Sequence, residues 1–372
     1  MIPQWEKDII ETSKQYVYSI EWLNPQEEVL DEVILDVVSG NVNFDSQSDS
    51  RRSCSLTLNN FDKSYLPAPN SKMWINNKFR LKAGYLYGHN QTLMYNQGIY
   101  CLGNPSILSN PTKKEVAIQG LDKWAWLDGT LGGKIGDVKL IVPHGTRFDT
   151  AIKMIIEDHT SETKYMIDEC VEEIPYDIEK PFGTTISEVL KEIADIVSYQ
   201  IFYDNDGILR FRKKIEPEDY NQTPISYSYT TEGLYLENTR ELNWNDVRNS
   251  IGVFGDTMES GVVIHATSQD NSDSEFSISN IGLKHDIVED TNIYSVGLAQ
   301  TRADWELQKR IMVAESNKGT IIPNFSHKLD DIINIEDENN GATQNYVLQN
   351  ISYDISFNST MNLGLWAVRD WR

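Results

Sequence analysis

Carboxylates are the side chains in this 372-residue sequence that come nearest to a catalytic arrangement. The stretch DECVEEIPYDIEK, residues 168–180, contains Glu172, Glu173 and Asp177. Two carboxylates facing each other across a cleft can cleave a glycosidic bond when burial raises the pKa of one of them. A cell-wall glycosidase that uses acidic residues within 168–179 is therefore one hypothesis. The competing interpretation is a solvated acidic face, which crowded carboxylates more often form.

Two glycine-containing stretches resemble ligand-binding loops in outline only. In DGTLGGKIG, Asp128 stands where a phosphate-binding loop needs its first glycine, and Ile135 stands where a serine or threonine must bind magnesium. In a calcium loop built around DNDG, Phe202 would be the first ligand and Lys213 the twelfth, where a bidentate carboxylate is required. The first stretch therefore predicts a turn, and the second predicts a β-hairpin.

Histidines and cysteines do not have the spacing of metal ligands or of catalytic nucleophiles. No pair of histidines has HxxxH or HExxH spacing, no pair of cysteines has CxxC spacing, and no serine lies in a GxSxG elbow. The residues considered are His89, His144, His159, His265, His285, His327, Cys54, Cys101 and Cys170. We therefore expect no catalytic residue, no metal ligand, no cofactor and no disulfide framework.

Composition limits the classes of partner. Asp and Glu number 56 against 33 Lys and Arg, so the formal net charge is -23 and attraction to phosphate backbones or anionic lipids should be weak. A specific nucleic-acid binder is thereby disfavoured. No run of about 18 apolar residues and no signal peptide are found, which predicts a soluble protein without membrane insertion that is made in a reducing cytoplasm.

The first expected element is an N-terminal arm over residues 1–15. Its apolar residues Ile2, Trp5, Ile9 and Ile10 have helical spacing, which predicts a short amphipathic helix. This helix either packs on its own domain or docks on a neighbour. Alternating strands and turns then fill residues 16–135, among them RSCSLTLNN, FRLKAGYLYG and EVAIQGLDKWAWL. Several short strands without a long helix between them predict that this first β domain is a closed barrel or a sandwich.

Helical periodicity appears over residues 136–220. Thr146 is the expected cap of a helix that ends near His159. Thr185 and Glu188 form a T-x-x-E capping box for a second helix, and Asp206-Gly207 between two apolar runs predicts a hairpin. This part of the sequence is expected to form a small α+β insertion domain.

Strands return over residues 221–372, interrupted by one helix near 296–315. The final segment alternates apolar and polar residues from Val347, turns at Asn358, and resumes alternation up to Arg372, which predicts a closing hairpin with no appended module. The fold class is therefore mainly β with an α+β insertion: two β-barrel domains plus a small α+β domain.

Four stretches together resemble a known family. They are SCSLTLNNFDKSYLP with WINNKFRLKAGY, ISEVLKEIADIVSYQIFYDNDGILRFRKK, LAQTRADWELQKRI, and the terminal YVLQNISYDISFNSTMNLGLWAVR. In type and order they are similar to the baseplate hub proteins at the tip of phage tails and of phage-tail-like bacteriocins. Hubs of this family are trimeric rings built from two tail-tube-like β barrels per chain.

The resemblance implies a homotrimer whose six barrels form a pseudo-sixfold ring. Such a ring would join the hexameric tail tube protein to a threefold central spike protein, with the tape-measure protein and other baseplate proteins as further partners. It implies a place in the virion, after assembly in the host cytoplasm. Hubs in some phages carry or hold a peptidoglycan-cleaving domain, but this chain ends at Arg372 in a strand, so we expect no lytic activity of its own. A channel with few cationic side chains would also let DNA pass without trapping its phosphates. A saccharide-binding tail component using exposed Trp and Tyr residues remains an alternative.

Overall fold

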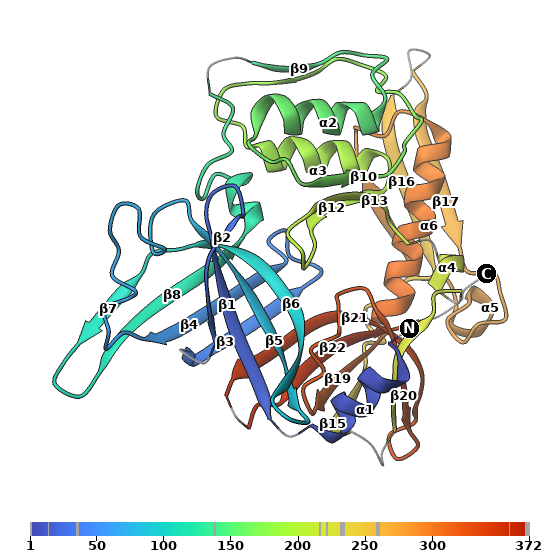
Figure 1. The fold of residues 1–372 in the computed structure, drawn as a ribbon. Helices are drawn as coiled ribbons and strands as arrows, with labels where there is room; N and C mark the ends of the chain where they lie inside the picture. The colour runs from blue at the N-terminus through green and yellow to red at the C-terminus, as the bar shows by residue number, and fades with distance from the viewer. Residues whose placement is uncertain are drawn as a thin grey trace.

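The structure is a computed structural model that describes residues 2–13, 15–34, 37–136, 139–215, 217–220, 222–230, 235–257, 261–356 and 358–368. The fold is mainly β, and its few helices are spread around the strands (Figure 1). This confirms the predicted fold class. Among the described residues no helix is long and apolar enough to cross a membrane.

The first β unit is defined here as strands β1 to β8. Their bounds are β1 Tyr16–Leu23, β2 Val29–Ile34, β3 Val37–Asp45, β4 Arg52–Asn59, β5 Lys78–Tyr87, β6 Gln91–Leu102, β7 Ser106–Ser109 and β8 Lys114–Asp122. The strands pair in the order β3-β4-β8-β6-β5-β1-β2, and all of these pairings are antiparallel. A 3₁₀ turn, η1 Lys123–Trp126, follows β8.

The second β unit is defined as six strands from the C-terminal part of the chain. They are β14 Ile225–Thr230, β15 Tyr235–Leu242, β19 Glu315–Ile321, β20 Ile332–Asp337, β21 Ala342–Ile355 and β22 Met361–Ala367. The antiparallel order is β15-β19-β22-β21-β20, and β14 lies parallel to β20. The predicted closing hairpin is confirmed as β21–β22, while residues 369–372 lie outside the described residues.

The two β units repeat the same strand order and the same register. The order β3-β4-β8-β6-β5 corresponds to β15-β19-β22-β21-β20, and the corresponding strands follow one another in the same order along the chain. In β3 the pairing with β4 skips one residue after Val37, and in β15 the pairing with β19 skips one residue after Tyr235. Strand β6 pairs with one part of β8, and β7 pairs with the next part, whereas β21 alone pairs along the whole of β22. Strand β7 therefore corresponds to the C-terminal half of β21.

The α+β insertion contains two long helices, one short helix and two small sheets. Its elements are β9 Leu140–Val142, α2 Phe148–His159, β10 Tyr165–Ile167, β11 Ile178–Lys180, α3 Ile186–Ile196, β12 Tyr199–Tyr203, β13 Leu209–Lys213 and α4 Pro217–Tyr220. The capping box of α3 is confirmed, since Thr185 Oγ1 accepts from Glu188 N and Glu188 Oε2 accepts from Thr185 N. The predicted hairpin is confirmed as β12–β13.

The predicted cap of α2 is wrong. The N-cap residue is Arg147, and its side chain makes no capping hydrogen bond. The N–H of Phe148 instead donates to the backbone carbonyl of Glu172 at 3.1 Å, and the N–H of Ile174 donates to Thr146 O at 2.8 Å. A distant backbone segment therefore satisfies the start of this helix, which no local pattern could indicate.

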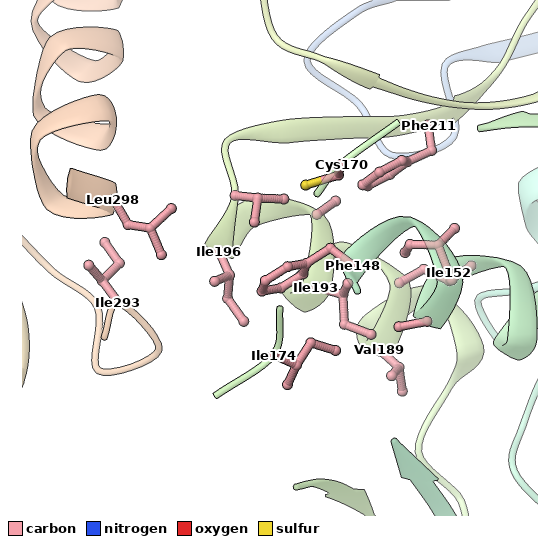
Figure 2. Packing of buried hydrophobic residues seen from close by; sticks show 14 of the residues in the cluster. Phe148, Ile152, Cys170, Ile174, Val189, Ile193, Ile196, Phe211, Ile293 and Leu298 are labelled. Atoms are coloured by element: carbon pink, nitrogen blue, oxygen red, sulfur yellow. The ribbon is translucent and has the colours of Figure 1, made fainter. Parts of the chain in front are cut away.

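A separate sheet interrupts the second β unit in sequence. It consists of β16 Ser250–Thr257, β17 Val263–Gln269 and β18 His285–Glu289, with α5 Ile278–Ile281 and the long helix α6 Val296–Val313. The long helix predicted near 296–315 is thereby confirmed. This sheet and α6 share one hydrophobic cluster with α2 and α3, where Ile293 and Leu298 approach Ile196 and Ile174 (Figure 2). Residues 221–372 thus contribute both to this cluster and to the cluster that the two β units share. The predicted domain boundaries at 135/136 and 220/221 stay predictions.

The N-terminal arm forms α1 Gln4–Thr12 and packs on both β units. Ile10 is fully buried in the cluster that the two units share. Tyr95 of β6 donates its hydroxyl hydrogen to Glu6 at 2.7 Å, and Tyr227 of β14 donates to Glu11 at 2.8 Å. Within this chain the arm therefore bridges the two units.

Candidate functional site

The acidic residues proposed for glycosidic cleavage lie on the surface. Glu172, Glu173 and Asp177 are all exposed, and Asp177 Oδ1 accepts a hydrogen bond from the backbone N–H of His144 at 2.8 Å. Raising a carboxyl pKa for general-acid catalysis requires the group to be withdrawn from water. The arrangement therefore supports a solvated acidic face.

The two glycine-containing stretches form turns. In the first, Thr130 N donates to Asp128 Oδ1 at 2.8 Å, and Ile186 N donates to Gly133 O at 2.7 Å, so the loop is fixed against the start of α3. In the second, Asp204 pairs with Arg210 at 2.6 Å and also accepts backbone N–H groups of its own turn. The carboxylate of Asp204 is therefore occupied by the hairpin itself.

The histidines and cysteines are dispersed. Five histidines are exposed, and His327 is buried with its Nε2 2.6 Å from the hydroxyl of Tyr229. Burial lowers the pKa of His327 to about 3, so this imidazole is neutral at physiological pH. All three cysteines are buried and free. Within the described part of the chain, no group of three or more His, Cys, Asp or Glu side chains could hold a metal ion.

Among the described residues, the exposed tryptophans lie on three separate elements of the chain. Trp5 lies on α1, Trp74 lies in the loop before β5, and Trp244 follows β15. Trp305 of α6 lines a cavity of about 370 Å³ and has two lysine ammonium groups near its ring, with Lys214 Nζ 4.4 Å and Lys309 Nζ 5.2 Å from the centroid. A face occupied by protein cations is poorly placed to receive a saccharide ring.

The arrangement with the clearest structural consequence is the seam between the two β units. The C-terminal half of β21 pairs antiparallel with β3, from Asn350 opposite Asp45 to Ile355 opposite Gly40. The core-facing side chains along it are fully buried, with Tyr353 and Phe44 at 3% and 1% exposure. The seam therefore joins two units by the edges of their strands into one 14-stranded sheet.

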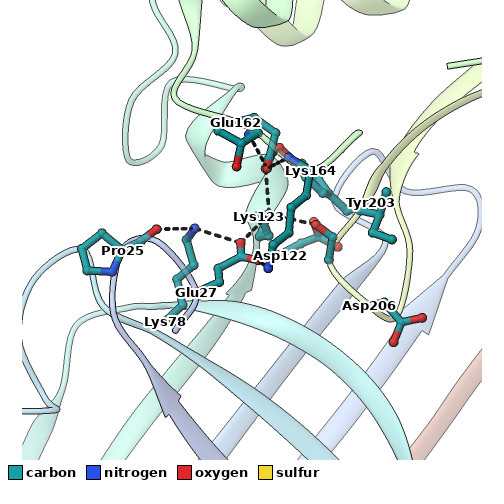
Figure 3. A network of polar contacts seen from close by, with 12 residues as sticks. Pro25, Glu27, Lys78, Asp122, Lys123, Glu162, Lys164, Tyr203 and Asp206 are labelled. Atoms are coloured by element: carbon teal, nitrogen blue, oxygen red, sulfur yellow. Dashed lines mark hydrogen bonds and ion pairs between the residues drawn. The ribbon is translucent and has the colours of Figure 1, made fainter. Parts of the chain in front are cut away.

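A buried ion cluster fastens the insertion to the first β unit (Figure 3). The ammonium of Lys123 lies 2.5 Å from Glu27 Oε1 and 2.7 Å from Glu162 Oε2, and its side chain is 2% exposed. Lys78 and Lys164 also reach Glu27, at 3.0 and 2.8 Å. Glu27 and Lys78 belong to the β unit, whereas Glu162 and Lys164 belong to the insertion, so the ion pairs cross the interface.

The tip of the β12–β13 hairpin completes this interface. Lys123 Nζ donates to the carbonyl of Gly207 at 2.8 Å. The guanidinium of Arg52 donates to Asn205 Oδ1 at 2.6 Å and also to the carbonyl of Tyr203. The Asp206-Gly207 turn that resembled a calcium loop is thus a docking element between the insertion and the first β unit.

The cluster changes the ionisation of Glu27. Burial acts to raise the pKa of this carboxyl group, but the charge of Lys123 and hydrogen bonds from Lys123 and Lys164 outweigh it. The pKa falls from 4.5 to about 2. Glu27 is therefore ionised throughout the physiological range, and the cluster remains a set of ion pairs there.

Comparison with solved structures identifies the fold. The chain superposes on a tail protein from Neisseria meningitidis MC58 with a TM-score of 0.66 and 11% identity, over 95% of this chain and 98% of that one. The chain has the fold of phage tail proteins. The 43 kDa tail protein of prophage MuSo2 from Shewanella oneidensis has the same fold, with a TM-score of 0.63, 12% identity and coverage of 96% and 100%.

A third phage tail protein has a similar fold. The prophage tail protein from Listeria monocytogenes EGD-e superposes with a TM-score of 0.55 and 13% identity, over 95% of this chain and 94% of that chain. The sequence matches no protein-family profile and no curated protein. The likeness is therefore carried by the arrangement of strands over nearly the whole chain.

Sequence reasoning missed the β21–β3 seam, the ion cluster and the strand-by-strand correspondence of the two β units, although the resemblance implied two barrels of one type per chain. In sequence, strands β2 to β8 lie between Glu27 and Lys123, and neither residue lies in a recognisable motif. The only available signal for the docking hairpin was Asp206-Gly207, which fixed the turn but not its partner.

Proposed function

We propose that this protein is the structural baseplate hub of a phage tail or a phage-tail-like particle. Three copies form a ring that joins a hexameric tail tube to a threefold central spike and leaves a channel for DNA or the tape-measure protein. Its place is the virion, after assembly in the host cytoplasm, among other baseplate proteins. The chain acts as a structural adaptor and carries out no reaction of its own.

The internal repeat is the observation that carries this proposal. The two β units have the same strand order and register, and they are joined edge to edge. Each chain can therefore fill two neighbouring positions of a ring. Closed cyclic symmetry with three such chains gives six nearly equivalent positions on one face and true threefold symmetry overall. This is the geometry that a connector between a sixfold and a threefold structure requires.

The tail-protein fold supports the same function, since it covers nearly the full length of this chain and of the structures compared. The surface position of Glu172, Glu173 and Asp177 supports the absence of glycosidase activity.

Measurement of the molar mass by light scattering over a range of protein concentrations tests the proposal. The expected species is a trimer, with three times the chain mass of 42.6 kDa. Purified cell wall incubated with the same protein should release no soluble glycan. A chain that stays monomeric at every concentration, or that hydrolyses cell wall in a manner lost on Glu172→Gln or Glu173→Gln, contradicts the proposal.

A further inference from the structure

The β21–β3 seam has two counterpart strands in the same sheet, β7 and β15, and each has one unpaired edge among the described strands. In the second β unit, the C-terminal half of β21 has β22 on one side and β3 on the other. In the first β unit, the corresponding strand β7 pairs with β8 on one side, and none of the described strands pairs with its other side. Similarly, β15 corresponds to β3, and its outer edge is also unpaired within the described chain.

We propose that β7 of one copy pairs antiparallel with β15 of the next copy, repeating between chains the β21–β3 seam within the chain. This inference rests on the proposed trimeric ring and assigns its contact strands. Around a ring of three copies, β21–β3 seams within chains would then alternate with β7–β15 seams between chains. The contact is heterologous, because each copy offers two different edges, and such contacts close into rings when the rotation fits.

Exposure of equivalent residues supports this assignment. Register places Ile107 of β7 where Tyr353 lies in β21, and places Leu242 of β15 where Phe44 lies in β3. Tyr353 and Phe44 are buried at the filled seam, whereas Ile107 and Leu242 are 49% and 43% exposed. Apolar side chains exposed on an unpaired strand edge favour pairing with another strand.

The position of β7 is compatible with a contact between chains. The β7–β8 hairpin projects from the first β unit, away from both the second unit and the insertion (Figure 1). All four residues of β7 are exposed. A hairpin that contacts so little of its own chain leaves its outer edge open to a second copy.

The repeat also fixes the register of the proposed contact. Within the chain, Ser352 lies opposite Asn43, and Asp354 lies opposite Asn41. Translating these pairs through the corresponding strands places Leu108 opposite Thr239 of the next copy. Leu108 is equivalent to Asp354, and Thr239 is equivalent to Asn41. Asp354 and Asn41 are both exposed, so cysteines introduced at positions 108 and 239 should remain accessible to an oxidant.

Disulfide trapping of the full-length chain tests the register. Leu108→Cys combined with Thr239→Cys should give covalent dimers and trimers on oxidation, because directly opposed residues have their Cβ atoms about 5 Å apart. Leu108→Cys combined with Glu237→Cys is the matched control, since Glu237 is exposed on the same strand two residues away. This control pair should give at least tenfold less cross-linking. Cys54, Cys101 and Cys170 are buried and should give no background.

A charge variant provides a second and independent readout. Ile107→Lys should convert the trimer to monomer, while Ile287→Lys, at a position 52% exposed on β18, should leave the trimer intact. The strand assignment alone is overturned if the wild type is a trimer, the Ile107→Lys variant is still a trimer, and the variant with Leu108→Cys and Thr239→Cys forms no cross-link. A wild-type chain that is monomeric throughout overturns both the ring and the assignment.

Discussion

Tyr100 and Tyr346 occupy the same position in the two β units. Tyr100 lies between Phe79 of β5 and Asp122 of β8, and Tyr346 lies between Ile333 of β20 and Ala367 of β22. Both side chains are fully buried. The neighbouring residues differ in chemical type although the register is the same. The two units are therefore related by backbone pairing more closely than by side-chain identity.

Replacing Lys123 by methionine should destabilise the protein strongly. The substitution leaves Glu162 and Glu27 buried without the ammonium they share, and removing one partner of a buried ion pair costs about 3 to 5 kcal/mol. Urea denaturation measures the loss in free energy of unfolding. Lys113→Met is the control, because Lys113 is 60% exposed and its contact with Glu115 at 3.4 Å should contribute less than about 1 kcal/mol. Equal effects of the two substitutions would refute the assigned role of Lys123.

The ion cluster should make stability dependent on pH in the acid range. The folded-state pKa of Glu27 is lowered from 4.5 to about 2, so its contribution is fully present above pH 4.5 and is lost as the pH falls towards 2. The size of this shift corresponds to a contribution on the order of 3 kcal/mol. Free energies of unfolding measured across this range should fall more steeply for the wild type than for Glu27→Gln. Glu28→Gln, at an exposed neighbouring position, should follow the wild-type profile.

Alanine at Gly207 should weaken the docking of the hairpin. Gly207 has φ of +72°, and a Cβ atom there would lie 2.8 Å from Cδ1 of Ile99 in the first β unit. Gly145→Ala is the matched control, with φ of +76° and no atom within 4 Å of the added Cβ. Both variants bear the backbone strain, about 1 kcal/mol, but only Gly207→Ala should lose a further 1 to 3 kcal/mol, roughly, by overpacking. Equal thermal denaturation midpoints for the two variants would show that the hairpin tip does not pack on Ile99.

The sequence predicted the elements whose signals are local. The Thr185–Glu188 capping box, the Asp206-Gly207 turn and the spacing along α6 each require only neighbouring residues, and the structure confirms all three. The start of α2 was predicted wrongly, because its first N–H is satisfied by Glu172, which comes later in the chain. Pairing between distant strands has no such local signal.

The resemblance implied two barrels of one type per chain, but the residue types do not indicate which positions of the two units correspond. Equivalent positions carry residues of opposite charge, as at Arg52 in β4 and Glu315 in β19, while the backbone register is preserved. Arg52 binds the insertion hairpin, and Glu315 pairs with Arg240 beside it at 2.7 Å. Each unit has adapted its side chains to different neighbours. Strand pairing therefore reveals an equivalence that residue types do not.

Electron-microscopic imaging of the purified, assembled protein tests the proposed hub most directly. Class averages viewed along the ring axis should show six similar densities around a central opening, with threefold symmetry arising from the insertion attached to alternate densities. Three chains per ring are expected. A closed ring of six chains, or particles without a central opening at concentrations where the protein associates, would contradict the proposal that two β units of one chain fill two positions of the ring.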